Sequence, residues 1–237
     1  MAVETFDFSR LLEHIKQYGF GEVQRLCYRN FTTELVLAEM EIVGRSRLPS
    51  FVIDDDNRFA YTNIARWLAA DPAMEQYNPE TGSVEKGDVN KGLYIAGPAG
   101  TGKTWAVEIT QYLCRFHGLK FRTYNTDRPL EIQDYRADEI TAEYARTGDL
   151  ELFANEKVLA INDLGSEPPE TLYMGNRVNV LRQLLERRGD DPSRITLITA
   201  NVPMNSKRLL DTYGDRVQSR LRAMCNNLVI KGKDRRI

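Results

Sequence analysis

Eight consecutive residues, Gly97 to Thr104, have the types and the spacing that bind a phosphate group. They fit the pattern G-x-x-x-x-G-K-[ST] at every fixed position. The glycines let the backbone curl so that its N–H groups point at phosphate oxygens. Lys103 is expected to reach the β- and γ-phosphates of ATP, and the Thr104 hydroxyl to bind Mg²⁺. The predicted nucleotide-binding residues are Gly97, Pro98, Ala99, Gly100, Thr101, Gly102, Lys103, Thr104 and Trp105.

The segments on either side of this loop predict the elements that hold it. Residues 92–96 are a short apolar run typical of a buried strand, and residues 105–117 are apolar at helical spacing. The loop therefore lies between a strand end and a helix start, where phosphate binding needs it. A glycine-rich turn that binds nothing is the alternative, and this context disfavours it.

Polar residues also follow two later apolar runs. Asn162 and Asp163 come directly after residues 158–161, where P-loop ATPases place acids that hold Mg²⁺ and polarise the attacking water. Asn201 follows the run 195–199 and is suited to orient a water beside the γ-phosphate, although it could instead serve as a turn-former before a proline. We predict Asp163 and Asn201 as catalytic residues. The predicted metal-binding residues are Thr104, Asn162 and Asp163.

Arg216 and Arg220 are four residues apart and share one face of a predicted helix. A guanidinium group can fork onto phosphate oxygens and stabilise the charge of a transition state. A solvated basic face is the alternative, and the spacing by itself favours that interpretation.

The composition limits the class of protein. A chain of 237 residues with 42% apolar residues is sized for one large domain, with or without a small appendage. A formal net charge of −2 gives no overall attraction to nucleic acid, so any contact with DNA has to be local. The three cysteines show no metal or redox spacing, which predicts reduced thiols. No signal peptide or membrane-length apolar run is present, so we expect a cytoplasmic protein without a membrane partner.

The chain is predicted to divide near residue 86. Residues 1–85 are expected to form a helical N-terminal region and the start of a linker at 71–91, and the aspartates at 54–56 a solvated turn rather than a metal cluster. Residues 86–237 alternate strands and helices, which predicts an α/β fold with a doubly wound, five-stranded parallel sheet flanked by helices. The predicted strands are 92–96, 119–124, 158–161, 195–199 and 228–230, with a strand-like run at 51–57. The predicted helices are 8–18, 22–43, 63–70, 105–117, 130–146, 178–188 and 206–213.

The order of these motifs resembles that of AAA+ ATPases of the bacterial helicase-loader type (DnaC-like) and of their IstB-like relatives in transposition. The resemblance runs from about residue 90 to the C-terminus. The P-loop is common to many ATPases, and the combination of three later motifs is specific to this group. These motifs are Asp163-Leu164-Gly165, Thr199-Ala200-Asn201 and Gly214-x-Arg216-x-x-Ser219-Arg220-Leu221.

The resemblance implies an AAA+ fold and a role for each matching residue. Asp163 takes the catalytic acidic position and Asn201 senses the γ-phosphate. Arg220 is implied to be an arginine finger that acts on the ATP of a neighbouring subunit, with Arg216 at the same interface, and hence a homo-oligomer. In the family the position of Asn162 usually holds aspartate, and an amide binds Mg²⁺ more weakly than a carboxylate does.

The implied partners are a replicative helicase and single-stranded DNA, with the N-terminal helices docking the protein partner. Basic residues could supply local phosphate contacts to the DNA. These residues are Arg182, Arg187, Arg188, Lys231, Lys233, Arg235 and Arg236. Arg236 also matches loosely the last arginine of a terminal family motif, in which Asp234 replaces a small hydroxyl residue.

Three functions from different classes remain open. The first is an ATP-dependent helicase loader or DNA-remodelling factor in replication, related to phages or mobile elements, with IstB-like transposition as a variant. The second is a small-molecule kinase, which the absence of an arginine-rich lid and of an acceptor pocket disfavours. The third is a nucleotide-gated binding module that hydrolyses ATP slowly or not at all, for which the neutral Asn162 is the argument.

Overall fold

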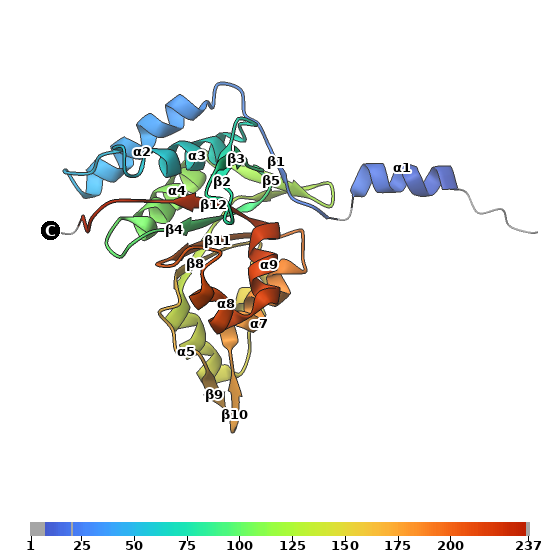
Figure 1. Cartoon of the computed structure of the whole chain (residues 1–237). Helices are drawn as coiled ribbons and strands as arrows, with labels where there is room; N and C mark the ends of the chain where they lie inside the picture. The colour runs from blue at the N-terminus through green and yellow to red at the C-terminus, as the bar shows by residue number, and fades with distance from the viewer. Residues whose placement is uncertain (1–7, 20, 236–237) are drawn as a thin grey trace, which may run out of the picture.

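A five-stranded parallel sheet lies at the centre of the molecule, with helices on both of its faces (Figure 1). The computed structural model describes residues 8–19 and 21–235. All neighbouring strands of this sheet pair in parallel, and β4 and β11 are buried at every residue, which explains their continuous apolar runs. The order is β12 (Cys225–Val229), β4 (Gly92–Ala96), β11 (Ile195–Ala200), β8 (Val158–Leu164) and β7 (Gln133–Arg136). The predicted fold class is confirmed.

The helices divide between the two faces of the sheet (Figure 1). One face carries α2 (Thr33–Arg47), α3 (Arg58–Ala69) and α4 (Lys103–His117). The other carries α5 (Ala137–Thr147), α7 (Val180–Gly189), α8 (Lys207–Tyr213) and α9 (Asp215–Met224), with the short α6 (Glu151–Asn155) after α5. The first helix, α1 (Phe8–Tyr18), projects away from this body. No helix among the described residues is long and apolar enough to cross a membrane.

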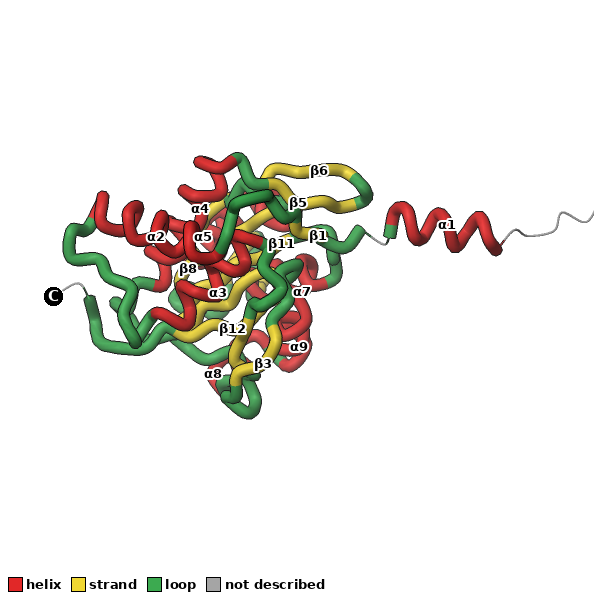
Figure 2. Tube along the Cα trace, turned by 90° about the horizontal axis from the view of Figure 1, so that it is seen from above, coloured by secondary structure: helices red, strands yellow, loops and turns green. Residues whose placement is uncertain are grey.

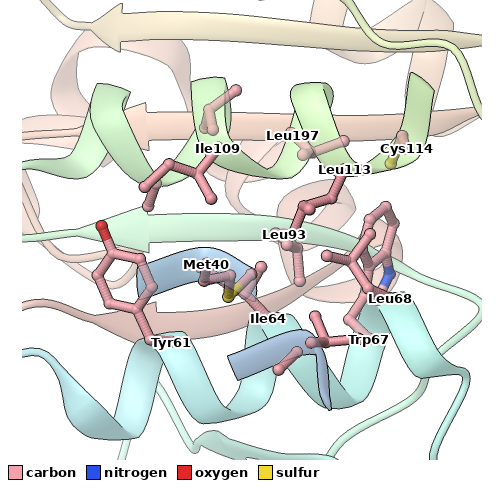
Figure 3. Packing of buried hydrophobic residues seen from close by; sticks show 14 of the residues in the cluster. Met40, Tyr61, Ile64, Trp67, Leu68, Leu93, Ile109, Leu113, Cys114 and Leu197 are labelled. Carbon is pink, nitrogen blue, oxygen red and sulfur yellow. The ribbon is translucent and has the colours of Figure 1, made fainter. Parts of the chain in front are cut away.

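The N-terminal helices share a hydrophobic core with the sheet (Figure 3). Ile64 and Trp67 of α3 and Met40 of α2 are completely buried against Leu93 of β4 and Leu113 of α4. Trp67 also donates its indole N–H to the carbonyl oxygen of Lys91 at 2.7 Å. Packing of α3 therefore fixes where β4 begins, and with it the loop that follows β4.

The helix predicted over residues 22–43 is wrong in its first half. Residues Gln24–Arg25 form β1, and α2 begins at Thr33, after Asn30 turns the chain with a φ of 65°. The Thr32 hydroxyl caps α2 by accepting a hydrogen bond from the backbone N–H of Leu35 at 3.3 Å. A threonine cap inside an apolar stripe marks a helix start that the stripe alone does not show.

The strand predicted at 119–124 exists but lies outside the central sheet. It forms β5 (Lys120–Thr123), which pairs antiparallel with β1 and with β6 (Thr126–Pro129). Figure 2 shows β5 and β6 as a hairpin that reaches out on the side where α1 leaves the body. Its turn uses Tyr124 and Asn125, both with positive φ. The fifth strand of the main sheet is instead β7, within residues 130–146 that were predicted to be helical.

Two other predictions change in detail. The stretch 51–57 contains no strand, and the predicted linker contains a hairpin of β2 (Glu75–Tyr77) and β3 (Val84–Lys86). This hairpin is fixed to β12, because the Asn227 side chain donates to the carbonyl oxygen of Tyr77 at 3.1 Å. A second hairpin, of β9 (Thr171–Tyr173) and β10 (Asn176–Val178), projects between β8 and α7.

Candidate functional site

The predicted phosphate loop lies at the carboxyl edge of the sheet, between β4 and the start of α4. The backbone N–H of Gly97 donates to the carbonyl oxygen of Ala200 at 3.2 Å, which ties the loop to β11. The Thr101 hydroxyl donates to the carbonyl oxygen of Pro98 at 2.9 Å, which closes the loop on itself. Helix α4 then begins at Lys103, so its N-terminal N–H groups point at the same edge.

A cavity of about 610 Å³ opens over this loop, within the range of about 300–1,000 Å³ common for ligand sites. It is formed by the loop itself, by the ends of β7, β8 and β11, by the segment 48–61 and by Arg235, which follows β12. The lining residues are Leu48, Ser50, Phe51, Val52, Asn57, Tyr61, Ala99, Gly100, Thr101, Gly102, Lys103, Thr104, Trp105, Glu108, Arg136, Asp163, Ser166, Asn201 and Arg235. Of the predicted nucleotide-binding residues, only Gly97 and Pro98 are absent from this lining.

Lys103 and Asn201 meet inside this cavity. The Lys103 ammonium group donates to Asn201 Oδ1 at 2.7 Å and to the carbonyl oxygen of Pro98 at 2.8 Å. Lys103 is 5% exposed, so its charge is held in a confined place. The structure thus brings together two predicted site residues that are 98 positions apart in the sequence.

The end of β8 places its two polar residues differently. Asp163 lines the cavity with a φ of 56°, a left-handed conformation that aspartate tolerates. Asn162 is 3% exposed and lies outside the cavity lining. Its side-chain amide donates to Asp134 at 2.6 Å and accepts from the Thr199 hydroxyl at 3.0 Å. This geometry does not favour Asn162 as a direct Mg²⁺ ligand.

Asp134 is an acid that the sequence did not single out. It lies on β7 beside Asn162, and burial raises the pKa of its carboxyl group to about 6, with smaller contributions from the nearby charges of Glu108 and Glu139. Asp134 falls within residues 130–146, for which the sequence predicts a helix, so no strand-end position was expected there. Once β7 is known to pair with β8, Asp134 becomes a neighbour of the site.

The two predicted arginines lie far from the cavity. The Arg220 guanidinium group donates to the carbonyl oxygen of Glu186 at 3.2 Å and forms an ion pair with Asp190, at the C-terminal end of α7. That end adjoins the first residue of β11, because Arg188 donates to the carbonyl oxygen of Ile195 at 2.7 Å. Arg220 is therefore at the amino edge of the sheet, opposite the phosphate loop. Arg216 lies beside it, 3.9 Å from Asp190. Neither arginine can reach the cavity of its own chain from there.

The C-terminal segment forms an unpredicted strap across the phosphate loop. The backbone N–H of Arg235 donates to the carbonyl oxygen of Gly100 at 2.9 Å, and its guanidinium group donates to Asp54 at 2.7 Å. This bond lowers the pKa of the Asp54 carboxyl group. Gly100 has a φ of 76°, and a Cβ there would lie 2.1 Å from the Asp234 carboxyl carbon. No local sequence motif predicts this packing of Arg235 against Gly100 and Asp54.

The predicted basic contacts with DNA are partly wrong. Arg188 is 1% exposed and Arg235 is paired with Asp54, so neither offers a free cation to a phosphate backbone. Arg182 and Arg187 are exposed but form ion pairs with Glu186 and Glu151. The prediction for Arg236 lies outside the described residues.

The residues present fit a nucleotide with Mg²⁺. The loop offers backbone N–H groups and Lys103 to phosphates, and the Thr104 hydroxyl and the Asp163 carboxylate supply the oxygen chemistry that Mg²⁺ prefers. Two lining residues, Trp105 and Arg235, also carry buried N–H groups without a hydrogen-bond partner in the described chain. No group of three acidic, histidine or cysteine residues suited to a metal is found within residues 8–19 and 21–235.

The strand order and the loop between β4 and α4 define a P-loop NTPase fold of the AAA+ type. Two solved structures share it. One is the DnaC helicase loader, with 20% sequence identity over 78% of this chain and 95% of that chain, at a TM-score of 0.50. The other is described as a candidate primosome component from Streptococcus pyogenes serotype M3, with 18% identity over 78% and 85%, at a TM-score of 0.52. The resemblance to helicase-loader ATPases is therefore confirmed at the level of the fold. No family model matches the sequence, and no curated protein matches it.

Proposed function

We propose that this chain is an AAA+ ATPase that binds ATP with Mg²⁺ in the cavity at the carboxyl edge of its sheet. The observation that carries the proposal is the hydrogen bond from Lys103 to Asn201 at 2.7 Å. Both residues line the cavity of about 610 Å³ that opens at the phosphate loop. This hydrogen bond supports the proposal because it joins the two residues for which we predict phosphate binding and γ-phosphate sensing. Exchange of the Pro98 and Asn201 contacts of Lys103 for phosphate oxygens would couple nucleotide binding to the end of β11.

In the proposed reaction each residue has one task. The Lys103 ammonium group neutralises phosphate charge, and the Thr104 hydroxyl holds the Mg²⁺ ion that compensates the charge developing during phosphoryl transfer. Asp163 polarises the attacking water and Asn201 orients it. Arg220 of a neighbouring subunit completes the site, which makes a homo-oligomer part of the proposal.

We further propose that this ATPase acts in DNA replication as a helicase loader or DNA-remodelling factor related to phages or mobile elements, with a replicative helicase and single-stranded DNA as partners. The shared fold with the DnaC helicase loader supports this role. An IstB-like role in transposition remains the variant that the motifs allow.

One observation favours a second function, a nucleotide-gated module that hydrolyses ATP slowly or not at all. The Asn162 side chain is neutral and already engaged by Asp134 and Thr199, so β8 offers only Asp163 to the cavity. Such a module would bind ATP and change its partners with little turnover.

ATP binding and ATP hydrolysis should be measured for the wild type and Lys103→Ala, with and without single-stranded DNA. Sedimentation of the same samples should be used to measure the oligomeric state. We expect Lys103→Ala to lose ATP binding by at least about tenfold, because phosphate charge is left uncompensated. Lys120→Ala, which removes an exposed lysine of β5, is the control and should behave as the wild type. Binding without turnover would favour the nucleotide-gated module, and a wild type that fails to bind ATP would refute both functions.

A further inference from the structure

The side chain of Asn162 is held in one orientation by a directional chain of hydrogen bonds. The backbone N–H of Asp163 donates to the Thr199 hydroxyl at 2.9 Å, and that hydroxyl donates to Asn162 Oδ1 at 3.0 Å. The amide N–H₂ group of Asn162 must therefore face the other way, where it donates to Asp134 Oδ1 at 2.6 Å. Asp134 is thus the acceptor for which the amide is oriented.

Asp134 lies on the same face of the sheet as α4. It is paired in register with Ala160, and both Ala160 and Ile132 belong to the core cluster that contains the buried residues of α4. Because side chains alternate along a strand, Ile132 and Asp134 point to this same face. Its acid group therefore belongs to the layer between the sheet and the helix that starts at the phosphate loop.

The level of Asp134 along α4 follows from one hydrogen bond. The Gln111 side chain donates to the carbonyl oxygen of Ile132 at 2.8 Å, which fixes α4 relative to the start of β7. From Gln111 back to Thr104 is about 10 Å of helix. From Ile132 forward to Asp134 is about 7 Å of strand. Both steps run toward the carboxyl edge of the sheet, so Asp134 lies near the first turns of α4, which carry Thr104, the predicted Mg²⁺ ligand, and Glu108, whose charge acts on Asp134.

We propose that Asp134 supplies from β7 the negative charge that β8 lacks at Asn162, and that it acts as a positioning residue for Mg²⁺ through the Asn162 amide and its electrostatic field. This inference rests on the proposed nucleotide binding. An aspartate in place of Asn162 would bring two carboxylates within hydrogen-bond distance, where like charges repel. The Asn162 amide instead donates to the Asp134 carboxylate, so the pair carries a single negative charge, which lies beside the ends of β7 and β8.

Glu108 and Glu139 are the acids whose charges act on Asp134, and their contacts separate them from it. Glu139 accepts a hydrogen bond from the backbone N–H of Arg136 at 2.9 Å at the start of α5. Glu108 forms an ion pair with Arg47, which offsets its charge. Within the described residues, Asp134 has Asn162 as its hydrogen-bond partner and takes part in no ion pair. The Asp134 carboxylate can therefore attract a cation bound in the cavity at the phosphate loop.

The test is the Mg²⁺ dependence of the affinity for a fluorescent ATP analogue, measured with EDTA and over a Mg²⁺ titration. Asp134→Asn should keep the affinity in EDTA, since an asparagine can still accept from Asn162. It should lose about tenfold or more of the Mg²⁺ affinity, as is common when a group that orients a metal site is removed. The swap Asp134→Asn with Asn162→Asp returns the charge and the hydrogen bond, so it should restore the Mg²⁺ affinity. Asp127→Asn, which removes an exposed acid on β6, is the matched control and should match the wild type.

The outcomes are separable from those of the proposed function. An equal loss of affinity with and without Mg²⁺ in Asp134→Asn would show a purely structural residue and overturn the inference. A normal Mg²⁺ dependence in that variant, or a swap that restores nothing, would overturn it as well. A wild type that binds no ATP analogue in EDTA or in Mg²⁺ would refute the proposed nucleotide binding, and this inference with it.

Discussion

Arg188 shows what a single buried cation contributes to this molecule. Its guanidinium group donates to the Thr196 hydroxyl at 2.9 Å and to the carbonyl oxygens of Glu156 at 2.8 Å and Ile195 at 2.7 Å. Burial lowers the pKa of Arg188 to about 9, because a charge away from water is costly. The side chain satisfies backbone acceptors at the amino edge of the sheet, so its role is structural.

We expect Arg188→Ala to lower the free energy of unfolding by about 3 kcal/mol, because several buried acceptors lose their donor. The adjacent Arg187→Ala is the control. Arg187 is exposed and paired with Glu151, so its removal should cost less than about 1 kcal/mol. Urea denaturation of both variants measures the difference. Equal losses would mean that the buried hydrogen bonds of Arg188 add nothing beyond a surface ion pair.

At the scale of elements, the C-terminal strap joins three parts of the chain at the mouth of the cavity. After β12 the backbone N–H of Lys231 donates to the carbonyl oxygen of Asp56 at 2.9 Å, and that of Arg235 donates to Gly100 at 2.9 Å. The strap thereby connects the N-terminal acidic turn to the phosphate loop. The acidic turn at 54–56 is exposed, as predicted, and within it Asp54 holds the Arg235 guanidinium group.

The strap predicts a pH dependence. The hydrogen bond from Arg235 lowers the pKa of Asp54 in the folded state. Asp54 therefore adds stability above its ordinary pKa of 3.8, and this contribution is lost as the pH falls through the lowered value. We expect Asp54→Asn to melt at a lower temperature than the wild type near pH 7. The loss in the free energy of unfolding should be less than about 1 kcal/mol, because the ion pair is partly exposed.

The difference between Asp54→Asn and the wild type should vanish in acid, and thermal melts from neutral pH down to about pH 2 would follow it. Asp55→Asn, in the same exposed turn, is the control. A difference that stays constant over this range would show that the ion pair with Arg235 does not contribute.

The elements that the sequence predicted well are those whose signals are local. The apolar runs predict β4, β8 and β11, and the phosphate motif predicts the start of α4. Ser206 marks the start of α8, since its hydroxyl accepts from the backbone N–H of Leu209. In contrast, β7 reads Gln133 to Arg136, a polar stretch whose strand character comes from pairing with β8. Its misassignment is what left Asp134 unnoticed.

The candidate site was predictable where one motif carries it and hidden where the chain folds back. Lys103 and Asn201 follow from strand-end motifs, and the structure places them in contact. The cavity wall of residues 48–61 and the strap at Arg235 depend on packing between segments far apart in the sequence. Long-range packing has no local period or spacing from which to predict it.

At the scale of the whole molecule, Arg220 and the phosphate loop lie at opposite edges of the sheet. If Arg220 completes the site of a neighbour, then Arg220→Ala should retain ATP binding and lose hydrolysis by about 10³-fold, the size of effect known for arginine fingers. Lys103→Ala should be inactive for a different reason, since it keeps Arg220 and lacks a working site. A mixture of the two variants should recover part of the activity, because some interfaces then join an intact loop to an intact Arg220.

A steady-state ATPase assay of the single variants and of their mixtures measures this recovery. Arg187→Ala mixed with Lys103→Ala provides the matched control for a lost surface arginine. Full activity of Arg220→Ala alone, or no recovery in the mixture, would remove Arg220 from the reaction and leave its ion pair with Asp190 as its role.

The opposite placement of these two surfaces also gives any such assembly a direction. Each subunit would offer its loop at one edge and its Arg220 at the other, so copies join head to tail, not about a two-fold axis. An open row then has one terminal subunit whose site no neighbour completes, whereas a closed ring has none. Activity per subunit would rise as a row lengthens and would stay constant for a ring, so its dependence on protein concentration distinguishes the two forms.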